Sequence, residues 1–173
     1  MNGYVQAPTF IDMPFLIVDD STIRDPFVAN PADAHVLIDL ENALSVLDAL
    51  GGCKFMGVLV SAAEIVDLVQ TATGWDFSLD EFHQCGDRLQ TMARAYCARE
   101  GMRREHDILP GRLMLDPLPD GPGKGMVLDR STLEKMKDAY YELRGWDVAS
   151  GVPTPAKLHE LDLDYLIPQL WNR

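Results

Sequence analysis

The spacing of apolar residues predicts helices over the middle of the chain. Apolar side chains recur at helical intervals through residues 36–50, and Gly51 and Gly52 then supply a stop signal. Two more helices are expected over residues 61–74 and 78–101, because each segment opens with a serine that is followed three residues later by a glutamate. That spacing is typical of a capping box, in which the two residues bond reciprocally across the first helical turn.

The C-terminal part alternates between helix-breaking residues and helical segments. Prolines and glycines are too frequent in residues 102–128 for a regular element, and the length of this stretch indicates a functional or interface loop. A helix is expected to begin at Ser131 and to end near Gly145, and a short last helix is expected to follow Pro155. The whole pattern predicts a mostly α fold, with one irregular helical domain over residues 36–173.

Residues 1–35 show no helical periodicity and are predicted to form an extended N-terminal arm. Any helix in this stretch would be interrupted by prolines, namely Pro8, Pro14, Pro26 and Pro31. The short apolar run over residues 15–18 fits either a buried strand or a packed extended segment, because periodicity does not separate these two structures.

Composition narrows the class of protein. The 173 residues include 15 Lys and Arg against 27 Asp and Glu, which gives a formal net charge of −12. We therefore expect no binding to nucleic acids or anionic membranes, since both attract positively charged surfaces. No apolar run approaches the ~18–20 residues of a membrane span, and the first residues lack the basic and apolar regions of a signal peptide. With only 3 cysteines, a secreted disulfide framework is not expected, and we predict a cytoplasmic protein.

The histidines and cysteines match no catalytic or metal-binding motif. The sequence has no C-x-x-C, H-E-x-x-H or EF-hand pattern, and 3 cysteines are too few for a four-cysteine site. Cys53 is the residue best placed to complete a site whose other ligands lie elsewhere, because it follows a helix end and two glycines, where backbone can approach a cofactor. The alternative interpretation is a packed structural cysteine. The glycine-rich segment 121–125 is interpreted as a turn, since Pro122 removes an amide that a phosphate-binding loop requires.

Several arginines lie on or just after the helix predicted over residues 78–101, namely Arg88, Arg94, Arg99, Arg103 and Arg104. The last three are near the C-terminal end of this helix, where the helix dipole favours positive charge. We expect these arginines to pair with the many carboxylates of the chain.

Several segments, in one order along the chain, are similar to sequence blocks of the tungsten-containing aldehyde ferredoxin oxidoreductases. The segment Asp48–Phe55 resembles the family's Asp-x-x-Gly-Leu-Cys motif, which is often followed by Lys-Phe. The other matching blocks are Ala72–Asp76, Gly86–Leu89, Arg99–Gly101, Asp107–Arg112, Pro117–Gly125, Tyr140–Asp147 and Gly151–Thr154. The resemblance spans residues 36–165, and no block of the family is matched within residues 1–35.

The resemblance implies a fold like the C-terminal domain of these enzymes and a share of their cofactor site. The family uses a tungsten or molybdenum bispterin cofactor (molybdopterin) beside a 4Fe-4S iron–sulfur cluster. By resemblance, Cys53 supplies one thiolate ligand of the cluster, and Asp48 hydrogen-bonds a pterin. Gly52 replaces the family's leucine at a position that approaches the pterin, so that the contact there would be altered or would come only from the backbone, as it would at Gly51. The chemistry is consistent, because cluster iron requires soft thiolate ligands.

The resemblance also implies a reaction, the oxidation of aldehydes to carboxylic acids with electron transfer to ferredoxin. The family's other cluster cysteines come from a C-x-x-C-x-x-x-C segment, which this sequence lacks. We therefore predict a C-terminal fragment or subunit that works with a chain or domain carrying that segment and the N-terminal cofactor-binding part. The alternative is a non-catalytic helical scaffold or binding module derived from the same domain, which Gly52 favours, whereas Asp48 and Cys53 favour the first prediction. A thiol-based redox role for Cys53, Cys85 and Cys97 has no motif to support it.

Overall fold

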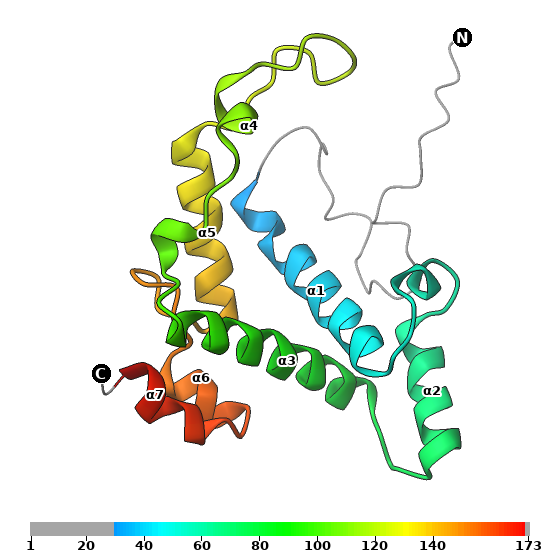
Figure 1. Ribbon diagram of the computed structural model, residues 1–173. Coiled ribbons are helices and arrows are strands. Elements are labelled where there is room, and N and C mark those ends of the chain that lie inside the picture. Colours follow the sequence, from blue (N-terminus) through cyan, green and yellow to red (C-terminus); the bar gives the residue numbers. More distant parts are fainter. Residues whose placement is uncertain (1–29, 172–173) are drawn as a thin grey trace, which may run out of the picture. The chain divides into compact units, whose positions relative to one another are not determined.

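The computed structural model describes residues 30–171, and these residues are helical, without a β-strand (Figure 1). The α-helices are α1 (Ala34–Ala49), α2 (Ala62–Thr73), α3 (Leu79–Arg99), α4 (Gly111–Leu115), α5 (Arg130–Arg144), α6 (Pro155–Glu160) and α7 (Ile167–Trp171). Short 3-10 helices lie between or before them, namely η3 (Pro31–Asp33), η4 (Lys54–Val58), η5 (Arg104–His106) and η6 (Asp164–Leu166). The predicted mostly α class is confirmed. Of the predicted extended arm, residues 1–29 lie outside the described residues, and residues 31–35 are helical, so the prediction is wrong for this part. Pro31 lies in the first turn of η3, where a helix tolerates proline.

The described residues belong to two compact units. The first unit contains residues 39–90, and the second contains residues 30–38 and 91–171. Both boundaries fall inside helices, so α1 and α3 each contribute residues to both units. Over the described part of the chain, no helix has the length and apolar character that crossing a membrane requires.

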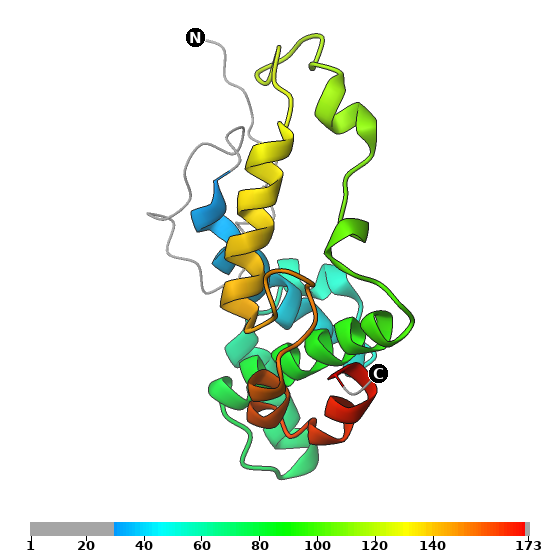
Figure 2. The ribbon, with the colours of Figure 1, turned by 90° about the vertical axis from the view of Figure 1, so that its left-hand side faces the viewer.

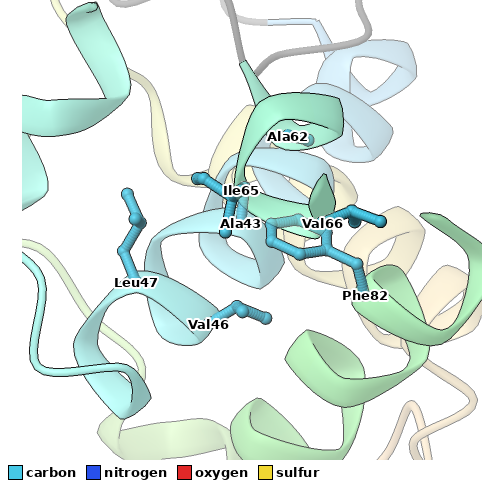
Figure 3. Close-up of a cluster of buried hydrophobic side chains, with 7 residues drawn as sticks. All are labelled: Ala43, Val46, Leu47, Ala62, Ile65, Val66 and Phe82. Carbon is cyan, nitrogen blue, oxygen red and sulfur yellow. The ribbon is translucent and has the colours of Figure 1, made fainter. Parts of the chain in front are cut away.

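Three helices build the core of the first unit. The buried side chains come from α1, α2 and α3 and are drawn in Figure 3: Ala43, Val46, Leu47, Ala62, Ile65, Val66 and Phe82. Within α1 and α2 they follow a spacing of one, three or four residues, which keeps them on one side of each helix. The apolar periodicity of the sequence therefore identifies the sides of α1 and α2 that face the core of this unit.

Both predicted capping boxes are present in the first unit. The Glu64 amide donates to Ser61 Oγ at 3.3 Å, and the Ser61 amide donates to the Glu64 carboxylate at 2.7 Å. Ser78 and Glu81 make the same pair of bonds, at 3.1 Å and 2.8 Å. These bonds satisfy amides that the first turn of a helix leaves without partners, which explains why α2 and α3 begin where the sequence predicts.

A glycine in the middle of α3 allows this helix to pack closely on α1 within the first unit. A Cβ atom built on Gly86 would lie 2.4 Å from the carbonyl oxygen of Asn42 and 2.7 Å from its Cα. Beside this contact, Gln90 Nε2 donates to Ser45 Oγ at 2.7 Å. The block Gly86–Leu89, which resembles the family, therefore begins with a residue that packing requires.

A buried arginine organises the second unit. Arg94 of α3 donates to both carboxylate oxygens of Asp107, at 2.9 Å and 2.6 Å, and to the Gly151 carbonyl at 2.7 Å. The hydroxyl of Tyr141 on α5 also donates to Asp107. Burial alone would raise the pKa of Asp107, but the bonds from Arg94 and Tyr141 outweigh burial and lower this pKa. These bonds join α3, α5 and two connecting segments.

A second arginine ties the segment after α3 to α5. Arg104 Nη2 lies 2.6 Å from Glu134 Oε2, and Arg104 Nη1 lies 2.6 Å from Asp138 Oδ1. The Arg104 amide also donates to the Ser150 carbonyl at 2.9 Å. The predicted pairing of arginines with carboxylates is thus confirmed for Arg94 and Arg104.

The segment rich in proline and glycine is more regular than predicted. Within residues 102–128 the structure contains η5 and α4, so the expectation of no regular element there is wrong. The reason is that Pro110 immediately precedes α4, where the missing amide of a proline removes no bond inside the helix. Figure 2 shows the chain passing through α4, turning and returning into α5. The turn predicted over residues 121–125 is present.

The beginning of α5 differs slightly from the prediction. Asp129 caps this helix, not Ser131, because the Thr132 amide donates to Asp129 Oδ1 at 3.0 Å. The helix ends at Arg144 before Gly145, whose φ of 67° is the left-handed conformation expected of a helix-ending glycine. The short helix expected after the Pro-Thr-Pro segment is α6, and α7 follows it.

Candidate cofactor-binding site

The four predicted site residues lie at the turn that ends α1. Asp48 is in the last turn of the helix, and Gly51, Gly52 and Cys53 follow it. Gly51 has a φ of 74°, a backbone conformation that requires little conformational energy for glycine and more for other residues. The Gly51 amide donates to the Asp48 carbonyl at 3.0 Å, and the Gly52 amide donates to the Leu47 carbonyl at 2.9 Å. The second bond spans six residues, as in a Schellman motif, and it gives this segment a defined backbone.

Cys53 is an exposed cysteine at the start of η4, and it forms no disulfide. Its backbone is extended, and its carbonyl accepts a hydrogen bond from the Met56 amide at 2.8 Å. The interpretation of Cys53 as a packed structural cysteine is wrong, because the residue is exposed to solvent. Cys85 and Cys97 are partly buried instead. Among the cysteines, Cys53 is therefore the most accessible to an external metal group.

Lys54 forms an ion pair with the Asp48 carboxylate across the turn. Lys54 Nζ lies 3.0 Å from Asp48 Oδ2, and the two side chains are 57% and 54% exposed. An ion pair this open to water contributes only about 0–1 kcal/mol to stability. A competing hydrogen-bond donor can therefore displace Lys54 at a small cost, and the Asp48 carboxylate is available as an acceptor.

The turn fits one cluster ligand and one pterin contact, and not a complete metal site. A Cβ built on Gly51 would meet nothing within 4 Å, so the space beside the turn is open. The side chains of Cys53 and Asp48 suit these two cofactors, since a thiolate binds cluster iron and a carboxylate accepts hydrogen bonds from the N–H groups of a pterin. Within residues 30–171, no three His, Cys, Asp or Glu side chains are grouped so that they could hold a metal ion. A cluster at Cys53 would therefore need ligands from beyond the described residues.

Gly52 occupies the position that the family motif gives to leucine. A Cβ atom on Gly52 would lie 3.3 Å from the Leu47 carbonyl oxygen and 3.6 Å from the Met56 sulfur. The first distance is tighter than ordinary van der Waals contact, so a larger side chain would shift the turn by a few tenths of an ångström. The turn in this chain is therefore packed for glycine.

An exposed apolar surface next to the turn was missed by the sequence analysis. It consists of Leu50, Phe55, Met56 and Leu59, which are 52%, 80%, 36% and 81% exposed, and we call it the Cys53 surface. The sequence signal that was available is the short run of apolar residues directly after Cys53. This run is too short to show a helical periodicity, so the sequence does not indicate which of its side chains face the core. The four side chains are close together in the sequence, and exposed apolar residues that adjoin one another are typical of an interaction site.

The second unit contains a cavity, which involves none of the predicted site residues. Its volume is about 180 Å³, and it is lined by Met92, Ala95, Tyr96, Arg99, Tyr165, Leu166, Gln169 and Leu170. This space is below the usual size of a pocket for a small-molecule ligand, ~300–1,000 Å³. The exposed turn at Cys53 is therefore the better candidate site.

The helical fold and the sequence motif at the Cys53 turn indicate a domain of an oxidoreductase. A family model described as "Aldehyde ferredoxin oxidoreductase, domains 2 & 3" matches residues 3–163, and the chain belongs to this family. The match begins at residue 3, so the expectation that the resemblance starts at residue 36 is wrong. A family model weighs every position, whereas short blocks stand out only where several consecutive residues agree.

Curated relatives support the same assignment. The tungsten-containing aldehyde ferredoxin oxidoreductase of Pyrococcus horikoshii is 31% identical over 162 residues, which are 93% of this chain and 25% of the relative. The enzyme of the same name from Pyrococcus abyssi is 30% identical over 165 residues, or 95% of this chain and 25% of the relative. This chain therefore spans about a quarter of the length of these relatives.

A solved structure shares the fold. The active site complex BamBC of benzoyl coenzyme A reductase, in complex with 1,5-dienoyl-CoA, matches with a TM-score of 0.63 and 22% identity. The match covers 77% of this chain and 19% of that chain. At this identity the match shows the fold alone, and it confirms the predicted irregular helical domain.

Proposed function

We propose that this chain is the C-terminal, cofactor-completing part of a tungsten- or molybdenum-pterin aldehyde ferredoxin oxidoreductase. In this proposal Cys53 gives one thiolate to a 4Fe-4S cluster, and Asp48 accepts hydrogen bonds from a pterin. Gly51 and Gly52 allow the backbone to approach the same pterin. The observation that carries the proposal is an exposed cysteine on a glycine turn, beside an exposed carboxylate, inside the family's sequence motif.

The proposed reaction is the oxidation of an aldehyde and water to a carboxylic acid, with release of two protons and two electrons. The metal-pterin group, when bound, supplies the oxidising centre. Two residues of this chain would hold these groups: Cys53 would bind the cluster through its thiolate, and Asp48 would orient a pterin by accepting from its N–H donors. The cluster that Cys53 would help to hold would supply the path for electrons toward ferredoxin. We place the assembly in the cytoplasm, where thiols stay reduced.

The proposal requires further polypeptide. The curated relatives are about four times as long as the matched segment, and the C-x-x-C-x-x-x-C segment is absent from this sequence. The remaining cluster cysteines and the N-terminal cofactor-binding part would come from a separate chain or domain. In the assembly, the helical domain begins with η3 and α1, and the residues before them belong to the same family region.

Anaerobic co-expression tests the role of Cys53. The chain is produced with the protein of the same organism that carries C-x-x-C-x-x-x-C, and the purified complex is analysed for iron, tungsten and molybdenum. We expect Cys53→Ser to lose the cluster iron and to lower aldehyde-dependent ferredoxin reduction at least a hundredfold. Cys97→Ser is the matched control, since Cys97 is partly buried, and it should keep both. A Cys53→Ser complex with a full complement of iron would contradict the proposal.

One observation favours a second candidate, a non-catalytic helical scaffold or binding module. The turn is packed around Gly52, so the side chain that the family places against the pterin is missing. If the chain is a scaffold, it should purify as a colourless, metal-free and monodisperse protein, even after co-expression with the cysteine-bearing protein. Metal analysis of the co-expressed sample therefore separates the two candidates.

A further inference from the structure

The cavity of the second unit lies between two helical walls. One wall is the C-terminal part of α3, from which Met92, Ala95, Tyr96 and Arg99 line the cavity. These residues follow one another at intervals of one or three positions and therefore lie on one side of the helix. The other wall comes from η6 and α7, and Figure 2 shows α7 beside the end of α3. All the lining residues belong to the second unit.

The wall formed by η6 and α7 is held in place by contacts of its own. Leu166 and Leu170 pack against a cluster of three buried leucines. At the end of α7, Trp171 Nε1 donates to the Pro153 carbonyl at 3.0 Å. The cavity therefore has a defined shape before a ligand enters it, which lowers the entropy cost of binding.

The volume and the lining of the cavity limit the size and the polarity of its ligand. The volume of about 180 Å³ is too small for a nucleotide or another large cofactor. It is sufficient for one ring, since an apolar cavity of about 150 Å³ in another protein takes up benzene. Six of the eight lining residues are apolar or aromatic, so the part of the ligand that fills the cavity is apolar.

Arg99 gives the cavity a positive charge. Its guanidinium carbon lies 5.0 Å from the centre of the Tyr96 ring, and this cation–π contact positions the side chain on the α3 wall. Arg99 Nη1 donates to Gln169 Oε1 of the other wall at 3.4 Å, which is longer than a usual N–H···O bond. The side chains of the Arg99–Glu100 ion pair are 36% and 59% exposed, so this pair contributes little to stability. A ligand carboxylate replaces such contacts at a small cost, because its two oxygens match the N–H fork of a guanidinium.

We propose that this cavity binds a small monocarboxylate whose apolar body is a single ring or a short branched chain. The apolar body fills the space between Ala95 and Leu170, and the carboxylate accepts hydrogen bonds from Arg99. Both parts of the ligand are required, because a neutral ring leaves Arg99 without a charged partner and a bare anion leaves the apolar space unfilled. The inference does not depend on the proposed function, since none of the lining residues belongs to the Cys53 turn.

An NMR titration of the isotope-labelled chain with benzoate measures the affinity and locates the site. We expect backbone amide signals from residues 92–99 and 165–170 to shift and to saturate. The Kd should be on the order of 1 mM, because so small a ligand makes few contacts. Benzyl alcohol has the ring without the charge, and acetate has the charge without the ring. Each of these two probes should bind about tenfold more weakly than benzoate, or weaker still.

Two variants test the two parts of the site. Arg99→Gln removes the charge and should weaken benzoate binding about tenfold or more, as the loss of a charge-assisted hydrogen bond does. Ala95→Leu fills the cavity and should abolish the binding, and circular dichroism verifies that both variants keep the helical fold. If Ala95→Leu does not fold, Arg99→Gln still decides the question. Arg112→Gln is the matched control, because Arg112 is an exposed arginine of α4 in the same unit, and it should bind like the unmodified chain.

Several outcomes would overturn the inference. The site is wrong if benzoate causes no saturable shifts, or if the shifts lie outside residues 92–99 and 165–170. The role of Arg99 is wrong if benzyl alcohol binds as tightly as benzoate, or if Arg99→Gln weakens binding no more than Arg112→Gln does. None of these results bears on the ligand role of Cys53, which is measured by the cluster iron of Cys53→Ser.

Discussion

Replacing Gly86 with alanine should destabilise the protein, although glycine is a poor helix former. In an exposed helix interior, glycine to alanine stabilises by about 1 kcal/mol. In the first unit, however, the new Cβ would lie 2.4 Å from the Asn42 carbonyl oxygen and 2.7 Å from its Cα and carbonyl carbon. Ordinary contact begins at 3.4 Å, so the clash with the oxygen amounts to about 1 Å (3.4 − 2.4). These atoms are backbone and have no rotamer to which they can move.

The magnitude follows from two opposing effects. Overpacking costs about 1–3 kcal/mol, and a rigid backbone obstacle places Gly86→Ala near the upper end. Subtracting the gain of about 1 kcal/mol in helix propensity leaves a loss of about 2 kcal/mol. A chain of this length loses about 2–4 °C of Tm per kcal/mol, so Tm should fall by about 4–8 °C.

Urea unfolding followed by circular dichroism measures this effect. Gly111→Ala is the matched control, since its Cβ would meet only the Leu115 side chain, at 3.8 Å. We expect that variant to be as stable as the unmodified chain or slightly more stable. If Gly86→Ala unfolds at the same or a higher urea concentration than the unmodified chain, the close approach of α3 to Asn42 is refuted.

Two further predictions concern local and buried polar groups. Ser61→Ala should lower the free energy of unfolding by about 1 kcal/mol, because it removes the cap of α2, and the same urea titration checks this. Asp107 has a lowered pKa in the folded state, so its bonds stabilise the fold above the usual pKa and this contribution disappears as the pH falls through the folded-state pKa. Stability should therefore fall below about pH 4. The slope with pH should be shallower in Asp107→Asn, and equal slopes would count against the pairing with Arg94.

Rules on neighbouring residues predicted most helices. They misplaced the start of α5 by a few residues and missed the short helix α4. The starts of α2 and α3 followed from Ser61 and Ser78, because capping is a contact between residues three apart. The start of α5 was misassigned because Asp129 and Ser131 are both good capping residues, and only the bond to the Thr132 amide distinguishes them. The helix α4 was missed because a proline breaks a helix interior but is well accommodated just before its first turn.

The candidate site was predicted in its residues but not in its surroundings. The motif around Asp48 and Cys53 could be recognised along the chain, since its members are separated by only five positions. Which side of the turn faces water could not be recognised in this way. The apolar residues after Cys53 have the composition of a core segment, and only their position relative to the packed helices shows that Phe55 and Leu59 are exposed.

The sequence by itself determined the helical class, the family and which cysteine lies in the motif over Asp48–Phe55. All three depend on short-range spacing, which the linear order of residues preserves. The tertiary structure alone decided that Gly86 is required for helix packing, that Arg94 joins Asp107 and Gly151, and that an apolar surface flanks Cys53. The two packing features depend on contacts between residues 13 to 57 positions apart, and the exposed surface depends on the absence of such contacts. Contacts of this kind exist only after the chain has folded.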